Sequence, residues 1–280
     1  MTMVRVSDWL AASAAKLSPV ELPRLEANLI LSSVLDVEKS WLLVNPDFLL
    51  PAGALARADV LLDRRISGEP LPYLLGEWEF FGLSLHVTPA VLIPRPETEI
   101  LVEAALAYLE RTQPASALDL GTGSGCIPIA ITANNAAVRF TATDISAQAL
   151  TIAQLNADRY GLRDRLSLVQ ADLASCFTGK FSLITANLPY IPSADLAGLD
   201  VAAHEPRLAL DGGSDGLDLN KRLLQHARWL LSNPGLLLLE MQYDQSAALY
   251  VYAQSVFPNA EICILPDLAG LPRVLRLELK

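Results

Sequence analysis

From Ser116 onward, the chain alternates between segments typical of buried β-strands and segments typical of amphipathic helices. Apolar, β-branched runs recur, and between most of them apolar residues return at helical spacing, as in Ala147–Tyr160 and Asn220–Leu231. This alternation predicts a parallel α/β sheet with helices on both faces. Only Pro266–Arg273 separates the last two strands, which favours an antiparallel hairpin at the sheet edge. The predicted strands are Ala117–Leu120, Arg139–Thr143, Leu166–Gln170, Phe181–Ala186, Gly235–Met241, Glu261–Leu265 and Val274–Leu279.

The residues before this part follow a different pattern. From Ser7 to about Ile66, apolar residues recur at three- and four-residue spacing, which predicts a small bundle of short helices. From Pro70 the spacing changes to near-alternation, with Gly82 between two apolar runs, which predicts a hairpin. A chain of 280 residues is long enough for two domains. We expect a helical N-terminal domain at 1–75, a β-hairpin connector at 76–96 and an α/β domain at 97–280.

Charge and composition narrow the class of function. The chain carries 31 Asp and Glu against 21 Lys and Arg, a net charge of −10, and has no dense basic cluster, so duplex nucleic acid is not an expected direct partner. Its three cysteines lack CxxC or Cys/His spacing, so we expect reduced thiols and no metal site. No run approaches the roughly 20 apolar residues that span a bilayer, and the N-terminus lacks a signal-peptide pattern. We expect a cytoplasmic monomer without a membrane partner.

A glycine-rich segment follows the first predicted strand of the sheet and opens a helix. It contains Gly121, Thr122, Gly123, Ser124 and Gly125. Glycines permit positive φ and the close approach of a ligand, and open α/β sheets bind ligands at the carboxyl ends of their strands. We therefore predict that this segment binds a nucleotide-like cofactor.

Two carboxylates end the next two strands of the prediction. Asp144 lies where a carboxylate can accept hydrogen bonds from both hydroxyls of a ribose, which suits NAD as well as S-adenosylmethionine. Asp172 can accept from an adenine amino group while Leu173 packs on the ring, although a helix N-cap is an alternative role for Asp172. Both aspartates and Leu173 are therefore predicted cofactor ligands.

The fourth predicted strand stops abruptly at Asn187-Leu188-Pro189-Tyr190, which we call the clamp segment. The Asn187 amide, the Leu188 carbonyl and the Tyr190 ring can together grip a planar amide or amino group. Hydride transfer has no need of such a set, whereas methylation of a planar NH2 needs acceptors for two hydrogens and a ring to sandwich it. The preferred hypothesis is therefore methyl transfer from S-adenosylmethionine, with the clamp segment as the catalytic residues and Asn187 also beside the cofactor.

These motifs, taken in order, resemble the N5-glutamine methyltransferases of peptide chain release factors, the PrmC/HemK family. The resemblance covers nearly the whole chain and is more specific than any single motif. It implies a class I, seven-stranded Rossmann-like methyltransferase domain, whose last strand is antiparallel, after a helical domain that helps recognise the release factor. It also implies that the substrate is the glutamine of the Gly-Gly-Gln motif in class 1 release factors. The segments that carry it are Gly68-Glu69-Pro70 to Gly76, Leu92–Glu99, Asp119–Ile127, Asn187–Tyr190 and Glu205-Pro206-Arg207 through Asp211-Gly212-Gly213 to Gly216-Leu217.

The chain departs from the family pattern at one position of the clamp segment. The family usually has Asn-Pro-Pro-Tyr, and this chain has Leu188 in place of the first proline. The carbonyl of residue 188 is kept, while the fixed φ of proline is lost. Pro189 still biases Leu188 towards an extended backbone.

Three other functions are compatible with parts of the sequence. An adenine-N6 DNA methyltransferase can use the same grip on an exocyclic amino group after base flipping, but the acidic balance argues against it. A catalytically inactive S-adenosylmethionine-binding paralogue is suggested only by Leu188. An NAD-dependent dehydrogenase shares the glycine-rich segment and Asp144, but it does not need the clamp segment.

Overall fold

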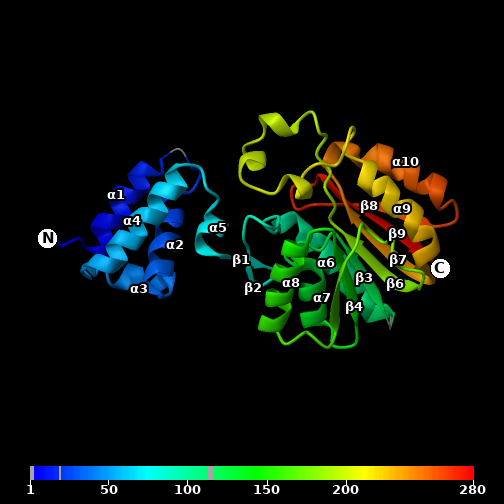
Figure 1. Ribbon diagram of the computed structural model, residues 1–280, viewed down its shortest axis with the longest axis horizontal. Coiled ribbons are helices and arrows are strands. Elements are labelled where there is room, and N and C mark those ends of the chain that lie inside the picture. Colours follow the sequence, from blue (N-terminus) through cyan, green and yellow to red (C-terminus); the bar gives the residue numbers. More distant parts are fainter. Residues whose placement is uncertain (1–2, 19, 113–115) are drawn as a thin grey trace. The chain divides into compact units, whose positions relative to one another are not determined.

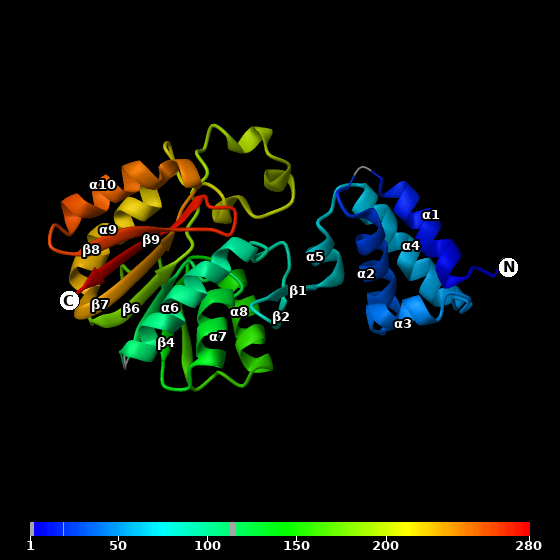
Figure 2. The same ribbon diagram turned by 180° about the vertical axis from the view of Figure 1, so that it is seen from behind.

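The computed structural model describes residues 3–18, 20–112 and 116–280 and divides the chain into two compact units, Met1–Gly76 and Glu77–Lys280. Figures 1 and 2 show the chain from opposite sides. Each unit has its own hydrophobic core. Within the described residues, no helix is both long and apolar enough to cross a membrane.

The first unit is a bundle of helices, as the apolar spacing predicts. Its core is formed by apolar side chains that include Trp9, Ile30, Leu31 and Leu62. The last short helix was not predicted, because the interpretation placed the change to strand-like spacing at Pro70. Leu71 joins the helical core. Pro70 and Pro72 lie at the start of this helix, where backbone N–H groups have no acceptor within the helix, so a proline costs no hydrogen bond there. The helices are α1 (Val6–Lys16), α2 (Pro23–Leu35), α3 (Lys39–Val44), α4 (Ala52–Ile66) and α5 (Leu71–Leu75).

The second unit contains the predicted sheet of seven strands. The strand order is β5-β4-β3-β6-β7-β9-β8. β9 is antiparallel to β7 and to β8, and the other pairs are parallel, so the predicted antiparallel hairpin at the edge is confirmed. The strands are β3 (Ala117–Leu120), β4 (Phe140–Asp144), β5 (Leu166–Gln170), β6 (Phe181–Ala186), β7 (Leu231–Glu240), β8 (Glu261–Pro266) and β9 (Pro272–Leu279).

Helices cover both faces of this sheet (Figures 1 and 2). The alternation of side chains along β7 shows why, since Leu236 and Leu238 join one apolar layer while Leu237 and Leu239 join the other. The first layer contains α6, α7 and α8 residues, and the second contains α9 and α10 residues. The helices are α6 (Glu99–Arg111), α7 (Cys126–Asn134), α8 (Ala147–Arg159), α9 (Asp218–Leu230) and α10 (Ser246–Val256), with short 3₁₀ turns η1 (Pro96–Thr98), η2 (Leu196–Gly198), η3 (Asp200–Ala203), η4 (Arg207–Ala209) and η5 (Tyr243–Gln245).

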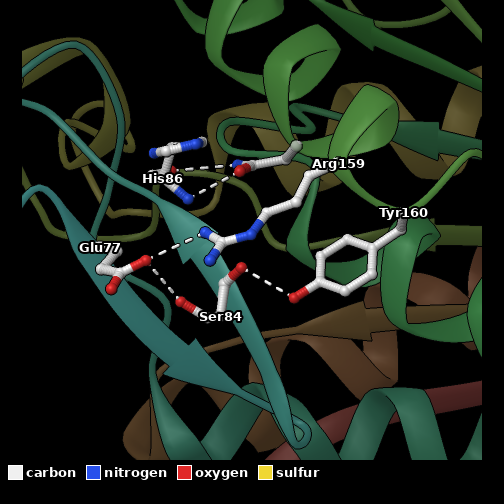
Figure 3. Close-up of polar contacts among 6 residues, drawn as sticks. Glu77, Ser84, His86, Arg159 and Tyr160 are labelled. Atoms are coloured by element: carbon white, nitrogen blue, oxygen red, sulfur yellow. Dashed lines mark hydrogen bonds and ion pairs between the residues drawn. The ribbon is translucent and has the colours of Figure 1, made fainter. Parts of the chain in front are cut away.

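A two-stranded hairpin, β1 (Glu77–Phe80) and β2 (Leu83–His86), precedes the sheet and lies against α8. Figure 3 shows its polar contacts: Arg159 pairs with Glu77 at 3.0 Å, and the Tyr160 hydroxyl donates to the Ser84 carbonyl at 2.8 Å. The buried amide of Asn156 makes the inner contacts. Its oxygen accepts from the His86 N–H at 2.6 Å, and its nitrogen donates to the carbonyls of His86 and Ser124 at 3.0 and 2.9 Å. Asn156 therefore ties the hairpin to the glycine-rich segment.

The replacement Asn156→Ala should lower the free energy of unfolding by roughly 3 kcal/mol, because it removes three hydrogen bonds and leaves the His86 N–H and the carbonyls of His86 and Ser124 without their partner. The exposed Thr151 of the same helix is the control, and Thr151→Ala should change stability by no more than about 0.5 kcal/mol. Urea unfolding followed by circular dichroism measures both. Equal stabilities of the two variants would contradict this role of Asn156.

Candidate active site

A cavity of about 500 Å³ opens at the carboxyl edge of the sheet. The ends of β3, β4 and β6 meet there because parallel strands present the same ends to one edge. The structure therefore brings together most of the residues that the sequence singles out. The predicted residues that line the cavity are Gly121, Thr122, Gly123, Ser124, Asp144, Asp172, Leu173, Asn187, Leu188 and Pro189. Gly125 and Tyr190 are not among the described residues that line it.

The three glycines after β3 all have positive φ, but their surroundings differ. A Cβ on Gly123 would meet nothing within 4 Å, so this part of the loop leaves its backbone open to the cavity. A Cβ on Gly121 would lie 2.8 Å from Cδ2 of Leu188. A Cβ on Gly125 would lie 2.9 Å from Cδ1 of Ile129 and 3.3 Å from Cβ of Ala153. The structure thus gives Gly125 a packing reason, since it lets α7 approach α8.

Asp144, the last residue of β4, holds the loop with both carboxylate oxygens. Oδ2 accepts from the Gly123 N–H at 2.9 Å, and Oδ1 accepts from the Ser146 N–H at 2.8 Å. Burial raises the pKa of this carboxyl, while the backbone N–H groups of Ser146 and Gly123 lower it. Each carboxylate oxygen can accept a second hydrogen bond, so Asp144 keeps acceptor capacity towards the cavity.

Asp172 and Leu173 also line the cavity and follow β5, the neighbour of β4, where the Ala171 N–H donates to the Asp144 carbonyl at 3.0 Å. The Asp172 carboxylate pairs with the Arg222 guanidinium at 2.8 Å, with both side chains about half exposed. Sequence reasoning missed this partner, because Arg222 comes from α9. Leu173 has a φ of 49°, a region that costs energy for a residue with a Cβ, and Thr143 donates to its carbonyl at 3.2 Å. Neighbouring Ile145, half exposed and also lining the cavity, is a further apolar surface that the sequence interpretation missed.

Asn187 follows β6 and is held by a residue far away in sequence. Its Nδ2 donates to Oγ1 of Thr98 at 3.1 Å, and Thr98 is buried in η1, at the start of α6. With its nitrogen used in this way, the side-chain oxygen of Asn187 is the group left for the cavity. Leu188 is buried, and its side chain packs beside Gly121.

The backbone after Asn187 is fixed by a glycine segment and a glutamine. Gln245 donates from Nε2 to the Tyr190 carbonyl at 2.8 Å, and the Gly212 N–H donates to the Ile191 carbonyl at 2.8 Å. A Cβ on Gly212 would lie 2.7 Å from the Pro189 oxygen, and one on Gly216 would lie 2.2 Å from the Tyr190 oxygen. Only glycine fits at such distances. This explains Gly212 and Gly216, to which the sequence alone assigned no physical role.

Glu205 anchors the cavity wall. Its carboxylate accepts from the Ile93 N–H at 3.0 Å and pairs with the Arg95 guanidinium. The Glu205 side chain is almost fully buried, while Arg95 lines the cavity. This pair joins the segment before η1 to the long excursion after β6. Neighbouring His204 makes only a backbone hydrogen bond, to Val201, among those found in the described residues.

Two buried acids, Asp119 and Glu240, do not line the cavity and had no role in the sequence interpretation. Burial raises the pKa of Asp119 to about 7, although hydrogen bonds from Thr185 and Thr122 lower it. Burial also raises the pKa of Glu240, the last residue of β7, to about 7. The available signal in both cases was an acidic residue within or at the end of an apolar strand.

The fold of the second unit occurs in solved methyltransferase structures. The catalytic domain of hMettl16 in complex with the MAT2A 3′UTR hairpin 6 aligns with a TM-score of 0.57 and 16% identity, covering 84% of this chain and 85% of that one. The ribosomal protein L11 methylase of Lactobacillus delbrueckii subsp. bulgaricus aligns with a TM-score of 0.52 and 22% identity, covering 69% and 84%. At these identities the likeness concerns the fold.

Sequence relatives cover almost the whole chain. Residues 8–76 match the PrmC N-terminal domain, and residues 97–203 match the methyltransferase small domain. The release factor glutamine methyltransferase of Moorella thermoacetica is 45% identical over 257 residues, which cover 91% of this chain and 90% of the relative. That of Neisseria gonorrhoeae is 40% identical over 273 residues, 95% of each. At this identity and coverage, the chain belongs to the release factor glutamine methyltransferase family.

Proposed function

We propose that this protein transfers a methyl group from S-adenosylmethionine to the side-chain amide nitrogen of the glutamine in the Gly-Gly-Gln motif of a class 1 peptide chain release factor. The observation that carries the proposal is the fixed amide of Asn187. Its nitrogen is bound to Thr98, which leaves its oxygen as an acceptor at a cavity lined by the glycine-rich loop. Family membership supplies the substrate class.

The cavity fits S-adenosylmethionine in size and in the groups it offers. Its volume of about 500 Å³ lies within the range of roughly 300–1,000 Å³ of small-molecule sites. Asp144 retains acceptor capacity for two ribose hydroxyls, and the open backbone at Gly123 permits close approach. Leu173 and Ile145 offer apolar surface for an adenine ring, with Asp172 beside them. When bound, the cofactor supplies an electrophilic methyl group.

The chain's contribution to the reaction is positioning and charge stabilisation. An amide nitrogen is a weak nucleophile because its lone pair is shared with the carbonyl, so alignment with the methyl group can supply up to about 7–11 kcal/mol. The Asn187 oxygen and the Leu188 carbonyl accept the two amide hydrogens and share the positive charge that develops on nitrogen. The Tyr190 ring does not line the cavity, so the proposal assigns it no contact with the substrate amide. The methylated amide then loses a proton to water.

We further propose that the N-terminal unit recognises the release factor. α3 exposes Leu43 and Val44 at 74% and 77% of their surface, which is a large apolar exposure for two neighbouring residues. Because a release factor acts on ribosomes, we propose that the enzyme works in the cytoplasm, as a monomer that contacts no nucleic acid directly.

The change Asn187→Ala should lower kcat for methylation of a co-purified release factor at least about 100-fold, since it removes one of two acceptors for the amide hydrogens. Mass spectrometry of the Gly-Gly-Gln peptide, which gains one methylene in the wild type, gives the rate. The exposed Asn134 on α7 is the matched control, and Asn134→Ala should leave the rate unchanged. Near-full activity of the Asn187 variant, or methylation of DNA adenine in place of the peptide, would contradict the proposal.

The change Leu188→Pro should leave kcat within about threefold of the wild type, because the carbonyl remains and proline fixes φ in the extended region that Pro189 already favours. The same peptide assay measures it. The control Leu188→Ala keeps the carbonyl but removes the packing against Gly121. A tenfold or larger loss in the proline variant alone would show that the backbone at this position is incompatible with proline.

The change Asp144→Ala should weaken S-adenosylmethionine binding by about 10- to 100-fold, since it removes hydrogen bonds to the ribose from a charged acceptor. Isothermal titration calorimetry measures the dissociation constant. The change Asp172→Ala should have a smaller effect, because that carboxylate is more exposed and already pairs with Arg222. Equal losses for the two variants would contradict the assignment of Asp144 to the ribose.

A further inference from the structure

Glu240 is a buried acid at the end of β7, beside the start of the clamp segment. β6 and β7 are parallel neighbours, and Ala186 pairs with Leu239, so Asn187 and Glu240 follow at the same level of the sheet. The Glu240 side chain is 1% exposed, and neither carboxyl oxygen has a hydrogen-bond partner among the described residues. It does not line the cavity. Burial of an acid without a hydrogen-bond partner costs stability, so its presence here calls for an explanation.

The groups that face Glu240 come from four directions. The hydroxyls of Thr98 and Tyr190 are near enough to lower the pKa of Glu240, although neither makes a hydrogen bond to it in the structure. Arg273 on β9 lowers the pKa through its charge, and Glu97 on η1 raises it. The Glu240 charge also raises the pKa of the Cys126 thiol at the start of α7, after the larger effect of burial. Desolvation outweighs the favourable contacts, so the pKa rises to about 7.

Thr98 makes a hydrogen bond with Asn187 and lies near Glu240, so the direction in which its hydroxyl donates can link the two residues. A hydroxyl has one proton to donate. If that proton points to the Glu240 carboxylate, the Thr98 oxygen can only accept from Asn187, and it does accept from Nδ2 at 3.1 Å. The Asn187 oxygen is then the atom left for the cavity.

We propose that Glu240 and Thr98 are positioning residues that fix the amide orientation of Asn187, so that its oxygen faces the substrate amide. This inference rests on the proposed function, because it assigns a purpose to the orientation of Asn187. When Glu240 is protonated, its own O–H can donate to Thr98. Thr98 is then free to donate to Asn187, whose amide can turn its nitrogen towards the cavity. A donor in that place cannot accept the substrate hydrogens.

We call the contacts from Glu240 through Thr98 to Asn187 the relay. The relay gives the enzyme a pH dependence that a purely structural acid would not produce: an acidic limb, in which kcat falls at low pH. Glu240 is ionised above its raised pKa, so kcat should rise with pH through about 7 and level off above it. In Glu240→Gln, the side-chain oxygen can accept from Thr98 as the proposal requires, but the group cannot titrate. This variant should keep kcat within about tenfold of the plateau and lose the acidic limb. In Thr98→Val, kcat should fall about tenfold or more while Thr98→Ser restores it, with S-adenosylmethionine affinity unchanged in both.

Asp119 is the control for the pH profile, because it is equally buried and its pKa is also raised to about 7. The variant Asp119→Asn should keep the acidic limb, whatever its amplitude. The double variant Thr98→Val/Glu240→Gln should be no slower than Thr98→Val alone, since both changes break the same chain of contacts. An acidic limb that persists in Glu240→Gln, or that disappears in Asp119→Asn, overturns the inference.

A spectroscopic readout separates this inference from the proposed function. The ¹⁵N side-chain resonance of Asn187, assigned by comparison with Asn187→Ala, should titrate near pH 7 in the wild-type chain and stay constant in Glu240→Gln. If the wild type methylates the release factor but the resonance does not titrate, the relay is wrong and the proposed function stands. If the resonance titrates but no methylation occurs under any condition, the relay stands and the proposed function fails.

Discussion

The hydrogen bond from Asn187 to Thr98 connects segments 89 residues apart and is the contact on which the candidate site depends. Asn187 is placed by β6, in the middle of the sheet, and Thr98 by η1 at the start of α6. α6 in turn packs on the face that receives Leu236 and Leu238 of β7. The orientation of the Asn187 amide thus depends on β6, on the neighbouring strand β7 and on the position of α6 against the sheet. A change to any of these layers moves the acceptor that the proposed reaction requires.

The sequence predicted the sheet well, because the period of a strand and the polar residue that stops it are local signals. Phe181–Ala186 is a strand with the predicted bounds, and Asn187 stands where its polar stop indicated. Partners from distant elements could not be predicted in this way. Arg222 pairs with Asp172 across 50 positions of sequence. Glu240 lay inside a predicted strand, but its position beside Asn187 follows from the pairing of β6 with β7, which no local pattern specifies.

Both buried acids stabilise the folded state most when they are protonated, whereas the proposed relay requires Glu240 to be ionised. The pKa of Asp119 in the folded chain is raised well above its ordinary value, so the folded state holds its proton more tightly than the unfolded state does. The favourable contribution of the protonated group is fully present below the ordinary pKa and is lost as the pH rises through about 7. The same holds for Glu240. Ionisation of Glu240, which orients Asn187 in the proposed relay, therefore costs stability in the pH range in which the site becomes competent.

Leu188 shows how packing can replace a conformational constraint. Proline at this position would reduce the freedom of the unfolded chain, an effect of about 0.4–1 kcal/mol. Burial of a leucine side chain is worth about 1.5–3 kcal/mol before the loss of its rotamer freedom, roughly 0.5–1 kcal/mol, is subtracted. The buried side chain beside Gly121 can therefore hold the segment as firmly as proline would. It does so through the glycine-rich loop, so the proposed methyl acceptor side and the proposed cofactor side of the cavity share a direct contact that proline, with its shorter ring, would weaken.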